Sequence, residues 1–222
     1  MEFPKTLIKR NGYIERIKPF MRKNIAKVLT GQRRVGKSFL LYQLMDQLLV
    51  EEPDANIIYI NFEDFAFSHI QTAEDMHAYI MSKFRKEKYN YIFVDEIQEI
   101  VNFERVIRSL LLNENNDIYI TGSNAKMLSG ELATYLSGRY IEFSVYSLSY
   151  LEFLAFHKLE NNNESLYLYS RYGGLPYLIN LPLKDETVNE YLKSVYSTIV
   201  FRDVVSRYNL RNSSFLEKLV QF

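Results

Sequence analysis

The stretch Gly31–Ser38 reads GQRRVGKS and decides the fold of this 222-residue chain. It matches the pattern G-x-x-x-x-G-K-[ST] at every position. The apolar run AKVLT at Ala26–Thr30 predicts a strand before it, and Lys37–Val50 predicts a helix after it, because apolar residues recur there at helical spacing. A strand, this loop and a helix, in that order, form the context in which the pattern binds the phosphates of a nucleotide.

The residue types of this loop suit phosphate chemistry. Gly31 and Gly36 let the backbone turn so that successive N–H groups converge on the phosphates, and the helix N-terminus adds positive potential. Lys37 is predicted to reach the β- and γ-phosphates, and Ser38 to offer its hydroxyl to Mg²⁺. The nucleotide-binding residues predicted from the pattern are Gly31, Gln32, Arg33, Arg34, Val35, Gly36, Lys37, Ser38 and Phe39.

Two adjacent acids follow another apolar run, YIFV at Tyr91–Val94. Ligands of open parallel sheets bind at the carboxyl ends of the strands, so Asp95 and Glu96 are predicted to face the nucleotide. Asp95 is predicted to hold Mg²⁺, mostly through water, and Glu96 to orient or deprotonate an attacking water. Glu96 favours hydrolysis over phosphoryl transfer, because small-molecule kinases usually lack a glutamate beside the metal-site aspartate. The segment NAKM at 124–127 is not the guanine-reading N-K-x-D element of a GTPase.

Two further polar segments follow later strands of the chain. DIYITGSN at 117–124 offers Thr121 and Asn124 as sensors of the γ-phosphate or of the attacking water. Gly138 and Arg139 precede the last predicted strand, and Arg139 is predicted to neutralise transition-state charge. It would act either in its own chain or in a neighbouring subunit of a homo-oligomer.

Short apolar runs alternate with helical patterns over the first two thirds of the chain. This alternation predicts a mainly parallel five-stranded sheet between helices, the α/β class of P-loop proteins. After Leu148 the pattern becomes helical, so we expect a P-loop domain at 1–148 and, at 149–222, a helical region that leads into an incomplete winged-helix-like segment. Further strands are predicted at 57–62, 91–94, 117–121 and 140–145, and helices at 73–84, 103–112, 151–156, 166–172, 188–200 and 215–222.

Composition excludes several classes of protein. The chain has 27 Lys plus Arg, 27 Asp plus Glu and no cysteine, so no global field, disulfide scaffold or thiolate metal site is expected. With no signal peptide and no apolar run long enough to span a bilayer, we expect a cytoplasmic protein without a membrane partner. Residues 1–37 contain eleven Lys or Arg and two acids, which indicates either a phosphate-contacting arm or a solvated face.

The series of motifs resembles the AAA-type ATPases of an ATP-binding family of bacteria and archaea whose C-terminal part is a domain of unknown function. The resemblance rests on GQRRVGKS, INFED, VDEIQ, ITGSN, LSGRYIEF, SLSYLEFL, YGGLP and RDVVSRYNLRN, and covers nearly the whole chain. It implies ATP as the nucleotide and a sheet in which the sensor strand separates the Walker A and Walker B strands. It also implies that Lys37 and Ser38 belong to Walker A, Asp95 and Glu96 to Walker B, and Arg139 to the family's Gly-Arg motif.

The sequence departs from this family at two places. Asn124 and Ala125 stand where small hydroxyl residues are more frequent. Chains of the family continue through a winged-helix-like region and a further domain, whereas this sequence stops at Phe222 on an apolar helical face. We therefore expect a piece of a longer protein, whose DNA or protein partner would bind through the missing part.

Three functions remain open at this point. The leading hypothesis is an Mg²⁺-dependent ATPase that hydrolyses ATP to ADP and phosphate and drives a conformational change. The alternative is a nucleotide-gated regulator that binds DNA or protein with little turnover. A P-loop kinase is the third, and Glu96 disfavours it.

Overall fold

A computed structural model of the chain describes residues 4, 7–123, 135–136 and 138–199. They form two compact units, the first ending at Tyr146 and the second beginning at Ser147. This boundary lies two residues before Leu148, where the sequence pattern changes. In the described part of the chain, no helix is both long enough and apolar enough to cross a membrane.

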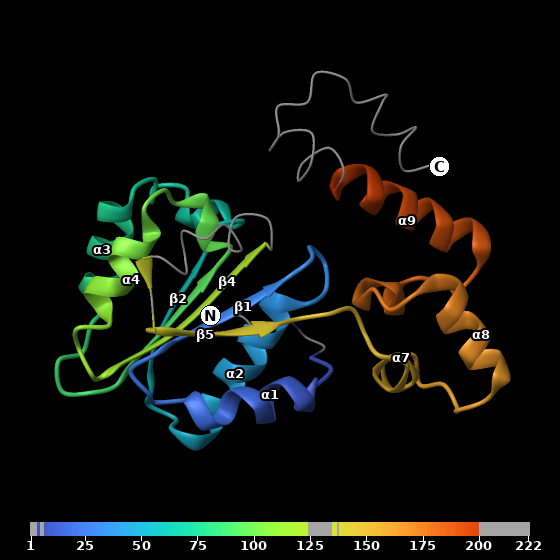
Figure 1. The fold of residues 1–222 in the computed structure, drawn as a ribbon, viewed down its shortest axis with the longest axis horizontal. Coiled ribbons are helices and arrows are strands. Elements are labelled where there is room, and N and C mark those ends of the chain that lie inside the picture. Colours follow the sequence, from blue (N-terminus) through green and yellow to red (C-terminus); the bar gives the residue numbers. More distant parts are fainter. Residues whose placement is uncertain (1–3, 5–6, 124–134, 137, 200–222) are drawn as a thin grey trace. The chain divides into compact units, whose positions relative to one another are not determined.

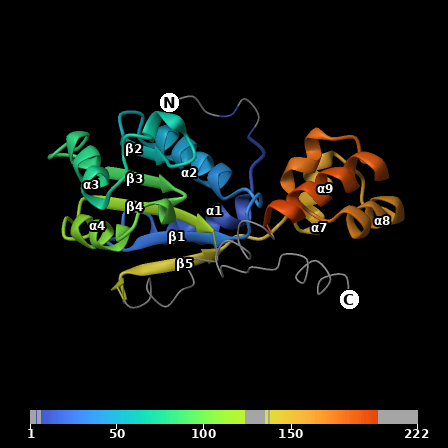
Figure 2. The same cartoon turned by 90° about the horizontal axis from the view of Figure 1, so that it is seen from above.

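The first unit is built on a five-stranded, all-parallel sheet, as the alternating pattern predicts (Figure 1). Its strand order is β2-β3-β4-β1-β5, which Figure 2 shows across the sheet. β4 therefore separates β1 from β3, which confirms the arrangement that the family resemblance implies. The strands are β1 (Ala26–Gly31), β2 (Asn56–Asn61), β3 (Asn90–Asp95), β4 (Asn116–Ser123) and β5 (Tyr140–Ser144).

Helices cover both faces of this sheet. One core packs Ile92 and Val94 of β3 against α3 and α4, and the other packs Phe93 and Tyr91 against α1 and α2. Every residue of β1 and β3 is buried for this reason. Burial on both faces explains why Tyr91–Val94 of β3 is a continuous apolar run rather than an alternating one. In the part of this unit that the structure describes, the α-helices are α1 (Asn11–Ile17), α2 (Lys37–Glu51), α3 (Ala73–Ser82) and α4 (Phe103–Leu110).

Some elements of this unit were not predicted. α1 spans seven residues and buries only Ile14 and Ile17, which is too short a pattern to stand out in the sequence. The predicted helices at 73–84 and 103–112 end two residues earlier in the structure, at Ser82 and Leu110. Among the described residues of this unit there are also three short 3₁₀ helices, η1 (Lys18–Phe20), η2 (Phe65–Phe67) and η3 (Ile97–Glu99).

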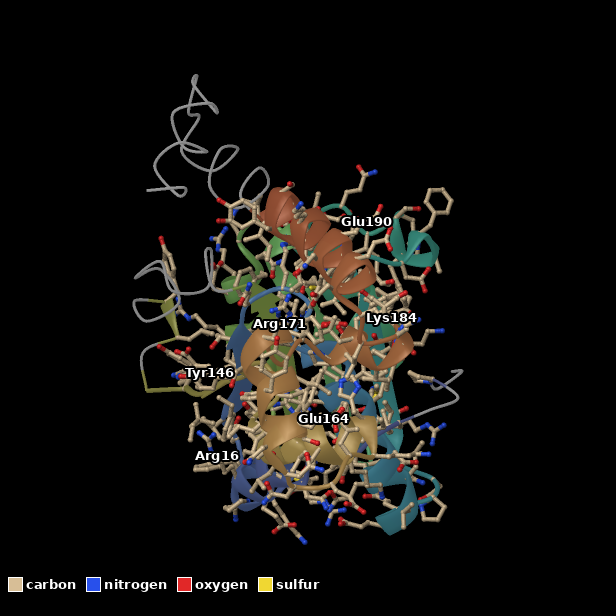
Figure 3. The ribbon with its side chains drawn as sticks, turned by 90° about the vertical axis from the view of Figure 1, so that its right-hand side faces the viewer. Arg16, Tyr146, Glu164, Arg171, Lys184 and Glu190 are labelled. Atoms are coloured by element: carbon tan, nitrogen blue, oxygen red, sulfur yellow. The ribbon has the colours of Figure 1, made fainter. Side chains whose placement is uncertain are left out.

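The second unit is helical in its described residues, as predicted. A capping box between Ser149 and Glu152 begins α7, and the Asn162 side chain caps α8. Arg171, which Figure 3 labels, lies on α8. Its Nε donates to the carboxylate of Asp185, the first residue of α9, at 2.6 Å. The elements are α7 (Tyr150–His157), α8 (Asn163–Tyr172), η4 (Pro176–Asn180) and α9 (Asp185–Ile199). The helix predicted at 215–222 and the winged-helix-like segment lie outside the described residues.

A buried ion pair occupies the amino-terminal edge of the sheet. Lys27 of β1 and Asp117 of β4 are both 0% exposed, and the Lys27 ammonium also donates to the Ile25 carbonyl at 2.8 Å. The Asp117 carboxylate accepts two further hydrogen bonds, from Arg22 N and from the Tyr119 hydroxyl, each at 2.8 Å. Lys27 belongs to the basic arm, so the interpretation of that arm as solvated or phosphate-contacting is wrong for this residue.

Candidate functional site

The phosphate loop connects β1 to α2 at the carboxyl-terminal edge of the sheet. β1 ends at Gly31 with φ 146°, and Gly36 caps α2 in the left-handed region with φ 95°. Arg34, between them, also has a positive φ, of 67°. These angles turn the loop over the beginning of α2, whose first N–H groups have no partner within the helix and carry its positive pole. The fold therefore provides the strand, loop and helix that the sequence pattern requires.

Gly31 is required by space as well as by its backbone angle. A Cβ atom at this position would lie 2.2 Å from the carbonyl oxygen of Val145, next to β5. We expect Gly31→Ala to lower the free energy of unfolding by about 2–3 kcal/mol, because a strained backbone and a clash with another backbone add together. Gly12→Ala in α1 is the matched control, since a Cβ there meets nothing within 4 Å. Urea denaturation of both variants measures the difference, and equal stabilities would contradict this reading of Gly31.

Lys37 lies inside the loop and faces the acidic residues. Its side chain is buried, and Nζ donates to the carbonyls of Gly31 and Gln32, each at 3.1 Å. Nζ also lies 3.9 Å from Oε1 of Glu96. Burial lowers the pKa of Lys37, and the charges of Glu96 and Asp95 oppose this effect. The ammonium of Lys37 therefore contacts the backbone of the phosphate loop and lies close to the carboxylate of Glu96.

Asp95 is the last residue of β3 and is almost fully buried. The strand register pairs Val94 with Ile120, so Thr121 lies beside Asp95 and donates its hydroxyl to Oδ1. Burial raises the pKa of Asp95, while hydrogen bonds with Thr121 and Ser38 act in the opposite direction. The Ser38 hydroxyl, at the start of α2, thus acts on the Asp95 carboxylate at the end of β3. Two such oxygens suit Mg²⁺, which takes few protein ligands beside water and phosphate.

Glu96 follows in an unusual backbone conformation. Its φ is 55° and its ψ is 47°, in the left-handed region that residues other than glycine seldom adopt. The Glu96 N–H donates to the Thr121 hydroxyl at 3.0 Å, so this hydroxyl bridges both acidic residues. Thr121, predicted as a sensor, therefore contacts Asp95 and Glu96 directly.

Gln98 is a site residue that the sequence analysis did not single out. It is buried in η3, and its Nε2 donates to Oε2 of Glu96. In the sequence, the one indication that Gln98 is buried is its place between Ile97 and Ile100, which are both part of the core. This signal is weak, because in sequence the same residue could equally lie on a solvated turn.

Two predicted site residues do not join this cluster in the described structure. Asn124 lies outside the described residues. The carbonyl of Arg139 accepts a hydrogen bond from Ala26 N, and Tyr140 pairs with Ala26, so Arg139 lies at the amino-terminal edge of the sheet. The loop lies at the other edge, about 16 Å away along β1. This distance is too long for Arg139 to reach phosphates on its own chain, and supply to a neighbouring subunit stays a prediction.

Arg10 is the second site residue that the sequence analysis missed. Its guanidinium Nη1 donates to the carbonyls of Val35 in the phosphate loop, at 3.0 Å, and of Tyr146, at 3.1 Å. It also lies over the ring of Tyr13, 4.6 Å from the centroid. Arg10 is buried, so the interpretation of the basic arm as solvated or phosphate-contacting is wrong here too. Arg10 thus links the phosphate loop to the segment after β5, because a guanidinium can donate to several acceptors in a fixed geometry.

Sequence comparison connects this site with known proteins. The family model of an AAA domain matches residues 23–154, which include the phosphate loop, both acids and Arg139. An uncharacterized protein of Haemophilus influenzae is 36% identical over 98% of this chain, and one of Methanocaldococcus jannaschii is 31% identical over 85%. The chain spans 56% and 44% of the lengths of these two relatives, about half of each.

Comparison of folds finds a solved structure whose fold is similar to that of this chain. The replication initiator DnaA bound to AMPPCP and single-stranded DNA is similar to this chain with a TM-score of 0.50. The match covers 91% of this chain and 72% of that protein, at 15% sequence identity. At this identity the likeness shows the fold alone.

Proposed function

Because this chain belongs to the AAA domain family, a family of P-loop nucleotide-binding domains, we propose that it binds ATP with Mg²⁺ and hydrolyses it to ADP and phosphate. One observation carries the proposal. A buried glutamate, Glu96, lies beside the buried Asp95 and 3.9 Å from Nζ of the phosphate-loop lysine, Lys37. A carboxylate in this place can accept a proton from water next to the γ-phosphate.

Each contact supports a separate role. Lys37 would exchange its carbonyl partners Gly31 and Gln32 for phosphate oxygens, since all three are on the same loop. Ser38 and Asp95 would hold Mg²⁺, which when bound neutralises phosphate charge. Thr121 fixes the Asp95 carboxylate and the backbone of Glu96 together, so that metal ligand and base keep one geometry.

A neighbouring copy of the chain would complete the site. Arg139 is exposed at the amino-terminal edge of the sheet, where it cannot serve its own loop but can face another subunit. An arginine supplied in this way stabilises transition-state charge in related phosphoryl-transfer sites. We therefore include a homo-oligomer in the proposal.

Lys37→Met tests nucleotide binding. We expect the ATP dissociation constant to rise about 10- to 100-fold, because one buried charge–phosphate contact of about 1.5–3 kcal/mol is lost. Isothermal titration calorimetry with Mg²⁺·ATP measures it, and Lys86→Met, at an exposed lysine, is the control. Unchanged affinity in Lys37→Met would show that ATP does not bind at this loop.

Turnover separates this proposal from the alternative. Free phosphate released from Mg²⁺·ATP by the unmodified chain supports hydrolysis, and specific activity that rises with protein concentration supports an arginine from a second subunit. Binding without turnover would favour a nucleotide-gated regulator of DNA or protein instead. The DnaA structure, which holds both AMPPCP and single-stranded DNA, is the observation that keeps this alternative open.

A further inference from the structure

Gln98 makes a buried contact to the one acidic side chain that would act on water. Glu96 is 7% exposed and Gln98 is 6% exposed, so both polar side chains are removed from solvent. Nε2 of Gln98 donates to Oε2 of Glu96. A hydrogen bond from an amide to a buried carboxylate fixes the orientation of that carboxylate, because few waters compete for it.

The backbone around this contact is held from several sides. Glu96 adopts the left-handed conformation, which is strained for a residue with a side chain, and Thr121 anchors its N–H. Ile97 and Ile100 on either side of Gln98 are buried in the core against α3 and α4. η3 is therefore a fixed support, and the left-handed turn brings the side chain of residue 98 back to that of residue 96.

The two oxygens of Glu96 consequently have different surroundings. Oε2 accepts from Gln98, whereas Oε1 lies 3.9 Å from Nζ of Lys37. Oε1 is thus the oxygen on the side of the phosphate loop. Without Gln98 the carboxylate could rotate about its terminal torsion, which is broad for glutamate, and either oxygen could leave this side.

We propose that Gln98 is a positioning residue that holds Oε2 of Glu96, so that Oε1 takes the proton from the attacking water. In this step an O–H bond of water breaks as its proton passes to Oε1, and the water oxygen bonds to the γ-phosphorus. The bond from the γ-phosphorus to the bridging oxygen breaks, ADP leaves with that electron pair, and Glu96 later returns the proton to solvent. This inference rests on the proposed hydrolysis.

Gln98→Met tests the proposal, since methionine has a similar length but no donor. We expect kcat for phosphate release to fall about 10- to 100-fold, the size of effect that misplacing a catalytic group produces. The dissociation constant of Mg²⁺·ATP should stay within twofold, because Gln98 contacts the base and not the loop. Gln98→Glu, which keeps the shape but places a second carboxylate beside Glu96, should lower kcat at least as much.

A double-mutant cycle separates positioning from a structural role. Added to Glu96→Gln, Gln98→Met should cause no further fall in kcat, because the group through which it acts is already gone. The control is Glu99→Gln, at the exposed position of the same 3₁₀ helix, which should keep the kcat of the unmodified chain. Thermal unfolding of each variant verifies that the fold is retained.

The outcomes distinguish this inference from the proposed function. If the unmodified chain releases phosphate and Gln98→Met and Gln98→Glu keep its kcat within twofold, only the inference is overturned. An equal further fall in the Glu96→Gln background would also overturn it, since Gln98 would then act independently of Glu96. If the unmodified chain binds ATP but releases no phosphate at any protein concentration, hydrolysis fails and the inference fails with it.

Discussion

Glu96→Gln should lower kcat for ATP hydrolysis about 10²- to 10⁴-fold, the range that a general base contributes. Glutamine has nearly the shape of glutamate and can still accept the hydrogen bond from Gln98, but it cannot take a proton from water. The affinity for Mg²⁺·ATP should stay within about threefold, because Lys37 keeps its place in the loop and Ser38 and Asp95 are unchanged. Phosphate release and calorimetric titration measure the two quantities separately.

The control for this variant is Glu63→Gln. Glu63 is an exposed acid whose carboxylate lies 3.6 Å from Arg33 of the phosphate loop, so it tests whether removing any nearby negative charge is enough. We expect its kcat to change little, since exposed ion pairs contribute little. Hydrolysis that survives Glu96→Gln undiminished would contradict the assignment of the base. Phosphate transferred to an acceptor would instead revive the kinase hypothesis.

Asp117→Ala should lower the free energy of unfolding by about 3–5 kcal/mol, because it leaves the buried ammonium of Lys27 without its counter-ion. The same change removes the acceptor of Arg22 N and of the Tyr119 hydroxyl. Burial lowers the pKa of Lys27 and Asp117 opposes this, so the lone lysine becomes still harder to keep charged. Urea denaturation followed by circular dichroism measures the loss.

A double variant tests whether the unpaired charge is the cause. Lys27→Met combined with Asp117→Leu should be less destabilised than Asp117→Ala alone, since a buried pair replaced by apolar residues leaves no charge uncompensated. Asp54→Ala is the surface control. Its carboxylate also pairs with a lysine, Lys88, but its side chain is 73% exposed, so no measurable change is expected. A loss for Asp117→Ala no larger than that for Asp54→Ala would contradict the explanation.

The phosphate loop and the acidic pair could be predicted from sequence because each depends on neighbours along the chain. GQRRVGKS needs a strand before it and a helix after it, and both signals are local. Asp95 ends a strand that is buried on both faces, and Glu96 follows it. Such burial leaves an apolar run, here Tyr91–Val94, that can be recognised in the sequence alone. The five-stranded parallel sheet could be predicted because such strand and helix patterns alternate along the chain.

The partners of these residues could not be predicted in the same way. Thr121 meets Asp95 because β3 and β4 pair in one particular register, and Arg10 meets Val35 across a separation of 25 residues. In the sequence, Lys27 belongs to a basic arm interpreted as phosphate-contacting or solvated. In the fold it pairs in the core with Asp117, which is 90 residues away. Charge counted along a chain says nothing about which opposite charge the fold brings beside it.

Arg139 illustrates the same limit at the scale of the sheet. In sequence it stands next to a strand, as the phosphate loop does, but before the strand rather than after it. In a parallel sheet, the residue before a strand and the residue after a strand lie at opposite edges. The direction of the strands therefore decides whether Arg139 can reach the phosphate loop of its own chain. By itself the sequence determined the fold class, the phosphate loop and the acidic pair, because local patterns encode them. Only the tertiary structure decided which residues hold Glu96, Asp95 and Lys27 in place. Thr121 and Asp117 make these contacts from β4, and the sequence does not show which strands pair or in which register.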